Sequence, residues 1–181
     1  TEELVGSAPH PAAIEDMLEL HALWAESDGR EGKPADLSGM DLRRVKKLSH
    51  RTLTALIAPG AVLYGINFEG ASLQGSNLAG ADLRGAKLCG ADLRGSNLSS
   101  AKLNNAVLRD VRLGPLLISE QRLLPARLDR AQARYTDFRG ADLRRANFAD
   151  ADLAYANFHD ADLRDAEIAS ALLTGTKLPA V

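Results

Sequence analysis

The chain is poor in cysteine and in aromatic residues. Cys89 is its one cysteine, and only 4% of its 181 residues are aromatic. A disulfide within the chain is therefore excluded, and Cys89 has no partner at the spacing of a Cys/His metal site. The scarcity of aromatic residues suits a narrow interior that is filled by smaller side chains. We expect neither a metal nor a cofactor.

Long apolar runs are also missing. No stretch approaches the ~20 apolar residues that a membrane-spanning helix needs, and no signal peptide is recognisable. A location in the reducing cytoplasm fits these absences. With 181 residues and a formal charge of −2, the chain is expected to form a single domain.

Signals of catalysis are absent as well. His10, His21, His50 and His159 lie far apart in the sequence, and none has the partner spacing of a catalytic triad or a metal site. The glycines recur at intervals of five residues, which is the spacing of corners rather than that of a phosphate-binding loop. The sequence therefore predicts a protein that is not an enzyme.

What the chain does contain is a repeat with a period of five. From Ala61 to Leu178 a large apolar residue stands at most fifth positions, with a small residue two positions before it. Helices and flat strands repeat every 3.6 and 2.0 residues, so a period of five indicates a solenoid. The central residues that we expect to form its core are Leu63, Phe68, Leu73, Leu78, Leu83, Leu88, Leu93, Leu98, Leu103, Leu108, Phe138, Leu143, Phe148, Leu153, Phe158 and Leu163.

The repeating unit reads Ala-(Asp/Asn)-Leu-X-Gly, as in residues 81–85 and 91–95. This pattern resembles the pentapeptide-repeat family. The resemblance implies an all-β solenoid, a right-handed four-sided parallel β-helix with one quintet per side and four quintets per coil. Family members act mostly as interaction or scaffold proteins, and a subset binds type II topoisomerases by imitating DNA.

A coil of twenty residues makes neighbours predictable. Phe138 should stack on Phe158, and Asp142 should lie beside Asp162, where nearby arginines neutralise both carboxylates. The residue types support this shape independently of the resemblance. The central leucine is expected to point inward, the small residue to fit a tight corner, and glycine to accept the positive φ of the turn. Such coils bury their apolar side chains only against one another and need caps at both ends.

Residues 1–34 lie outside the repeat, and residues 35–181 form the expected β-helix. A helical pattern starts at Pro11 and runs to about Glu26, with Ile14, Leu18 and Trp24 on its apolar face. We interpret this helix as an N-terminal cap on the first coil, and the alternative is a partner-binding helix.

The repeat is irregular at residues 43–60 and 114–126. In the first segment one residue is added, either in a short helix beginning near Ser49 or in a distorted coil centred on Leu48 and Leu53. This segment is also the most basic, and it is either a contact for an acidic partner or a solvated loop. In the second segment, two prolines flank residues that either complete one coil or bulge out as a loop.

Surface residues suggest a partner contact. Tyr135 and Tyr155 occupy equivalent positions in successive coils, and Asp110, Arg112 and the segment 115–125 could extend their patch. A bulged loop would expose further leucines. The candidate contact residues are Arg134, Tyr135, Tyr155, Leu116, Leu117 and Leu124.

The last coil suggests a second contact. Its strand edges and the outward Leu172 lead us to expect a homodimer through the C-terminal coil. The sides of the rod carry mixed charge, which disfavours close imitation of DNA and also direct binding of nucleic acid. We predict a bacterial-type interaction or scaffold protein with an unknown protein partner. The alternative is a protein that mimics DNA and binds or protects a type II topoisomerase such as gyrase.

Overall fold

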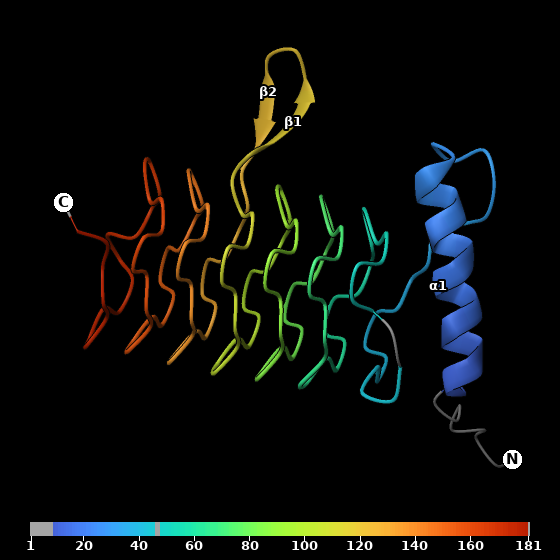
Figure 1. The fold of residues 1–181 in the computed structure, drawn as a ribbon, viewed down its shortest axis with the longest axis horizontal. Coiled ribbons are helices and arrows are strands. Elements are labelled where there is room, and N and C mark those ends of the chain that lie inside the picture. The colour runs from blue at the N-terminus through green and yellow to red at the C-terminus, as the bar shows by residue number, and fades with distance from the viewer. Residues whose placement is uncertain (1–8, 46–47, 181) are drawn as a thin grey trace, which may run out of the picture.

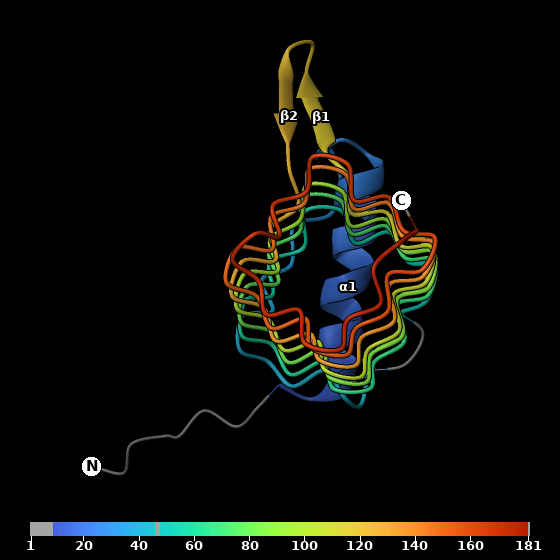
Figure 2. The ribbon, with the colours of Figure 1, turned by 90° about the vertical axis from the view of Figure 1, so that its left-hand side faces the viewer.

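The backbone winds into a stack of coils, and this computed structural model describes residues 9–45 and 48–180. Parallel bridges join residues twenty apart, such as Asp82 with Lys102 and Asn77 with Asn97. Figure 1 shows the coils side by side along the rod, and Figure 2 shows them nearly superposed when viewed along it. The solenoid that the period of five predicts and the β-helix that the resemblance implies are therefore confirmed.

Backbone hydrogen bonds join each coil to the next and also close each corner. Leu83 donates its N–H to the carbonyl of Lys102 at 2.7 Å, and Lys102 donates to the carbonyl of Ala81 at 2.9 Å. Within the corner, Ala86 donates to the carbonyl of Leu83 at 3.0 Å, around Gly85 at a φ of 67°. Glycine recurs at the fifth position because this turn needs a positive φ.

The core is a column of central residues. Every central residue named above is buried, except Leu163 in the last complete coil, which is half-buried. Phe138 and Phe158 stack with ring centroids 4.8 Å apart, as the twenty-residue spacing predicts, and Phe148 meets both rings edge-on at 6.0 Å. The interior is therefore a continuous apolar filling with aromatic rings near the C-terminal end.

One helix, α1 (Pro11–Glu26), lies across the N-terminal end of the stack (Figure 1). His10 caps its start by accepting the N–H of Ala12, and the chain leaves it through Gly29 at a φ of 80°. Ile14, Leu18 and His21 are its buried residues, while Trp24 is half-buried. An ion pair of 2.9 Å between Arg51 and Glu15 links the helix to the coils.

The first irregular segment is a coil rather than a helix. Asp36 pairs with Ile57, a separation of twenty-one residues, so one residue is added as predicted. Leu48 and Leu53 are buried in the core, and residues 49–57 contain turns and bridges in place of the alternative short helix. Lys46 and Lys47, two of the basic residues of this segment, lie outside the described residues.

The second irregular segment leaves the coil altogether. Strand β1 (Leu116–Ser119) pairs in antiparallel fashion with strand β2 (Arg122–Leu124), and this hairpin projects from the side of the rod (Figure 1). Across it, Asn97 pairs with Arg127, a separation of thirty residues. Of the two alternatives, the complete coil is therefore wrong, because ten residues are inserted between successive coils. The residues that keep the period of five here, such as Ile118, do so without entering the core.

Candidate interaction surface

The hairpin presents apolar side chains to solvent. Leu117 is 62% exposed, Ile118 44% and Leu123 42%, while Leu116 and Leu124 at its base are half-buried. Three of the predicted contact residues, Leu116, Leu117 and Leu124, thus lie in one small sheet. A cluster of exposed large apolar side chains on a projecting element is typical of a binding site.

Glycines seat the hairpin on the coils. A methyl group on Gly95 would meet the Cβ of Leu116 at 2.7 Å and the Leu124 side chain at 3.2 Å. A methyl group on Gly114, where the chain leaves the coil, would meet the Asp142 carboxylate at 2.8 Å. The base of the hairpin therefore packs closely on the rod, while its outer part stays free.

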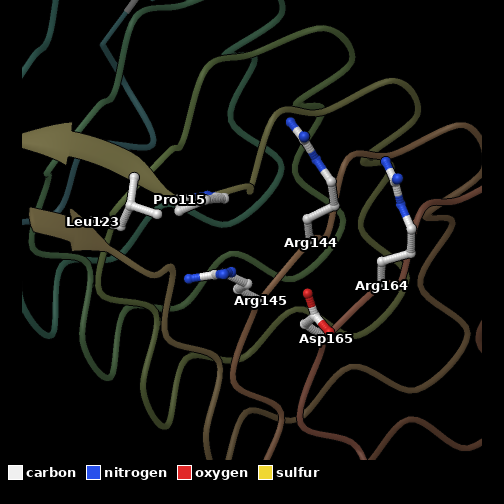
Figure 3. Close-up of a pocket in the computed structure, with 6 residues that line it drawn as sticks. All are labelled: Pro115, Leu123, Arg144, Arg145, Arg164 and Asp165. Carbon is white, nitrogen blue, oxygen red and sulfur yellow. The ribbon is translucent and has the colours of Figure 1, made fainter. Parts of the chain in front are cut away.

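A cavity of about 400 Å³ lies beside the hairpin, on the side of the later coils. Its lining combines apolar groups from the hairpin with charged groups from two successive coils (Figure 3). The lining residues are Pro115, Leu123, Arg144, Arg145, Arg164 and Asp165. Sequence reasoning missed this cavity. The sequence contains no specific signal for it, because many quintets besides that of Arg145 lack glycine at the fifth position.

Several aspartates of the coils are neutralised by an arginine of their own quintet. Arg144 binds Asp142 at 2.8 Å and Arg164 binds Asp162 at 2.6 Å, both through two nitrogen atoms of the guanidinium group. The hydrogen bonds from Arg164 lower the pKa of Asp162 to about 2. These carboxylates therefore stay ionised and paired at neutral pH, which suits them poorly for acid–base catalysis.

The predicted tyrosine pair forms, but far from the hairpin. Tyr135 and Tyr155 stack with centroids 4.9 Å apart and planes 8° from parallel, and Arg134 lies 5.9 Å from the Tyr155 ring. If the ten inserted residues are left out of the count, Tyr135 lies ten residues after the hairpin, which is half of a twenty-residue coil. The expectation that segment 115–125 extends the tyrosine patch is therefore wrong, because half a coil places the two on opposite sides.

The insertion also changes which charges share a side. Asp142 and Asp162 stay neighbours as predicted, but they follow Asp92 and Arg112 rather than Asp82. Residues joined by successive bridges form a series along one side of the rod. The most acidic of these bridge series starts at Asp36 and has seven quintets. It carries four carboxylates against two arginines, namely Asp36, Asp129, Asp150 and Glu167 against Arg127 and Arg130. A DNA duplex carries one charge per ~1.7 Å, so the described coils offer no comparable acidic face.

Other chemistry-bearing residues stay scattered. Cys89 is half-buried without a disulfide, and no group of three metal-ligating side chains exists within residues 9–45 and 48–180. In the same residues, no helix has the length and apolar character to span a membrane. The cytoplasmic location stays a prediction.

The family model for pentapeptide repeats matches the chain in eight copies, at residues 60–88, 76–114, 126–165 and 141–178. The chain belongs to the pentapeptide-repeat family. The two blocks of matches stop on either side of the hairpin, which is thus an insertion into the repeat. The family match points to structural and interaction repeats and indicates no catalytic family.

Several solved pentapeptide-repeat structures are similar. One from the cyanobacterium Cyanothece 51142 is 30% identical with a TM-score of 0.43, and the match covers 56% of this chain and 59% of that one. One from the Arabidopsis thaliana thylakoid lumen is 32% identical with a TM-score of 0.40, covering 65% and 68%.

A third similar structure is that of QnrB1, a plasmid-mediated fluoroquinolone resistance protein. It is 27% identical with a TM-score of 0.38, and the match covers 81% of this chain and 75% of that one. Of the Cyanothece structure described above, the chain spans about three fifths of the length. A search of curated proteins found no match.

Proposed function

We propose that this pentapeptide-repeat protein is a non-catalytic interaction module that binds a partner protein through its hairpin. The observation that carries the proposal is the exposure of Leu117, Ile118 and Leu123 on a sheet that projects from the rod. Burying such a side chain is worth about 1.5–3 kcal/mol relative to exposure. A partner surface that covers these residues would recover that free energy.

The hairpin has no evident role in building the rod. The bridge series continue on both sides of it, from Arg112 to Asp142 and from Asn97 to Arg127. A two-stranded hairpin in water is marginally stable by itself. A role in binding therefore accounts for the insertion better than a role in the stability of the coils.

Binding to a type II topoisomerase by imitation of DNA is less well supported. Imitation requires a dense acidic face, whereas many aspartates here are paired with an arginine of the same quintet, such as Asp82 with Arg84 at 2.7 Å. The surface charge therefore favours an apolar contact at the hairpin over an electrostatic copy of a duplex.

The finer architecture belongs to the same proposal. We infer that residues 35–181 form a right-handed, four-sided coil and that α1, within residues 1–34, serves as its N-terminal cap. Four bridge series spaced within each twenty-residue coil support the four sides. The burial of Ile14 and Leu18 supports the second.

A homodimer through the C-terminal coil remains a separate proposal. Leu163 and Leu173 are only half-buried there, and Leu172 is 49% exposed. The backbone edge of this coil would pair with the same edge of a second copy. Sedimentation at tens of micromolar that returns only a monomer would rule the dimer out.

The hairpin contact can be tested with surface variants that leave the core intact. Proteins captured on the full chain from a lysate are purified, and each is titrated against wild type, against the double variant Leu117→Ser with Ile118→Ser, and against Ile57→Ser as a matched control. Ile57 is also exposed, at 39%, but it lies outside the hairpin and the C-terminal coil. We expect the hairpin variant to lose at least about tenfold in affinity and the control to bind like wild type. A purified partner that binds the hairpin variant with unchanged affinity contradicts the proposal.

A further inference from the structure

The cavity beside β2 contains a cation with no partner in the described chain. Arg144 and Arg164 are held by Asp142 and Asp162, whereas the Arg145 side chain makes no hydrogen bond or ion pair with residues 9–45 or 48–180. In Figure 3, Arg145 extends toward Leu123 and Pro115, while Arg144 and Arg164 run side by side away from it. The cavity thus has one uncommitted guanidinium group next to an apolar wall.

Arg145 stands at the fifth position of its quintet. Its φ is 58°, in the left-handed region that the corner of each quintet requires, and other non-glycine residues such as Arg130 and Asp165 have the same φ at this position. The conformation therefore belongs to the repeat and places the Arg145 side chain at a corner of the coil.

Strand β2 adds an open sheet edge above this cation. The sheet has only two strands, so β2 pairs with β1 along one edge and leaves the other unpaired within the described chain. Leu116 of β1 and Leu124 of β2 both pack on Gly95 of the earlier coils, while Leu123 of β2 lines the cavity over the later ones. Figure 1 shows β2 on the side of the later coils, so its open edge lies on the side of the cavity that contains Arg145 (Figure 3).

We propose that an extended segment of a partner protein adds to β2 as a third strand and sets an aspartate or glutamate carboxylate on Arg145. This inference rests on the proposed function of the hairpin and names the chemistry of its partner. Main-chain hydrogen bonds to an open edge give affinity, and pockets for alternate side chains give specificity. An apolar side chain of the segment packs on Leu123 and Pro115.

The second charge in the cavity defines the next position of the segment. Asp165 follows Arg145 by one coil and has no hydrogen bond or ion pair from the described residues. A lysine or arginine of the segment would pair with Asp165. An alternating acidic and basic pattern fits the cavity better than a polyanion does.

The test uses the full chain and a phage-displayed library of random peptides about a dozen residues long. We expect enrichment of peptides that combine strand-forming apolar residues with an acidic residue. Calorimetry with a selected synthetic peptide should show that Arg145→Ala weakens binding about tenfold or more, because a charge-assisted bond is lost. Arg130→Ala is the matched control: Arg130 has the same φ of 58° and lies outside the cavity, so its replacement should change affinity less than about twofold.

Charge reversal and hydrogen exchange complete the test. Arg145→Glu should abolish binding, and the peptide with its acidic residue changed to lysine should restore it. Slower exchange of the Arg122–Leu124 amides in the complex should report the added strand. Selection that yields no acidic strand-forming peptide, or peptides indifferent to Arg145→Ala, overturns this inference. If those peptides bind the variant Leu117→Ser with Ile118→Ser more weakly than wild type, the proposed function of the hairpin stands. If the purified partner binds both this variant and Arg145→Ala with unchanged affinity, that function fails as well.

Discussion

The Nδ1 atom of His21 accepts a hydrogen bond from the backbone N–H of Ala35 at 3.0 Å. The other ring nitrogen, Nε2, lies 3.0 Å from the carbonyl of Thr54 and therefore donates to it. One fully buried imidazole thus joins α1 to the start of the repeat and to the first coils. This arrangement needs a neutral ring, because Nδ1 has to be free of a proton to accept.

Stability should therefore fall when the pH falls below about 6.5. Burial lowers the pKa of His21 below its ordinary value of 6.5, and backbone hydrogen bonds offset this only in part. Between that value and the lowered one, the unfolded chain binds the proton and the folded chain does not, so acid favours unfolding. Urea unfolding at several values between pH 7 and about pH 5 should show a free energy of unfolding that becomes smaller as the pH is lowered.

Replacing His21 provides the control for this pH effect. His21→Leu should cost about 1–3 kcal/mol at pH 7, because it leaves the Ala35 N–H and the Thr54 carbonyl without partners. It should also flatten the pH dependence in this window. A slope that persists in His21→Leu contradicts the assignment.

Close packing of the hairpin on the rod leads to a second prediction, for a pair of glycines. Gly85 and Gly95 have nearly the same φ, 67° and 66°, but a methyl group meets nothing at Gly85 and meets Leu116 at 2.7 Å at Gly95. Both alanine variants should lose about 1 kcal/mol from backbone strain. Gly95→Ala should lose about a further 1–3 kcal/mol or release the hairpin. Thermal unfolding and proteolysis within 116–124 measure the two effects, and equal behaviour of the variants would contradict the close contact.

The period of five predicts the regular coils but not the segments that depart from them. Strict spacing from Leu63 onward predicts which residues are buried, because one inward position recurs in every quintet. The spacing does not distinguish a complete coil from a bulged loop at residues 115–125, because Ile118 and Leu123 keep the period of five while lying in solvent. Local spacing does not record whether a segment enters the coil. That information lies in the pairing of Asn97 with Arg127, thirty residues away.

Candidate contacts were predictable only where they follow the repeat. The stack of Tyr135 on Tyr155 follows from equal positions in successive coils. The cavity at Arg145 was missed because it combines the hairpin with two later coils, and their juxtaposition depends on the length of the insertion. His21 falls within the helical pattern, but its two hydrogen bonds depend on how α1 docks on the coils.

Arginine controls the titration of the surface aspartates, which gives a third prediction. Hydrogen bonds from Arg164 are the largest cause of the low pKa of Asp162, about 2 against an ordinary 3.8. Carbon-detected NMR should find the midpoint of Asp162 near that value in wild type and closer to 3.8 in Arg164→Gln. Because the folded pKa is lowered, this carboxylate stabilises the fold above about pH 4 and loses its effect toward pH 2. An unchanged midpoint in Arg164→Gln would show that another group sets it.

The aromatic part of the core gives the last prediction. Phe68 and Phe138 are both fully buried, but Phe138 contacts the rings of Phe148 and Phe158, while no ring contact involves Phe68 in the described residues. Leucine at either site removes a similar volume, so the cost of burial and cavity formation is shared. Phe138→Leu should be more destabilising by about 0.5–1.5 kcal/mol, the value of aromatic contacts beyond their buried area. Urea unfolding of both variants, with Phe158→Leu as a third, measures the difference. Phe68→Leu as costly as Phe138→Leu would mean that the stacked rings add nothing beyond apolar volume.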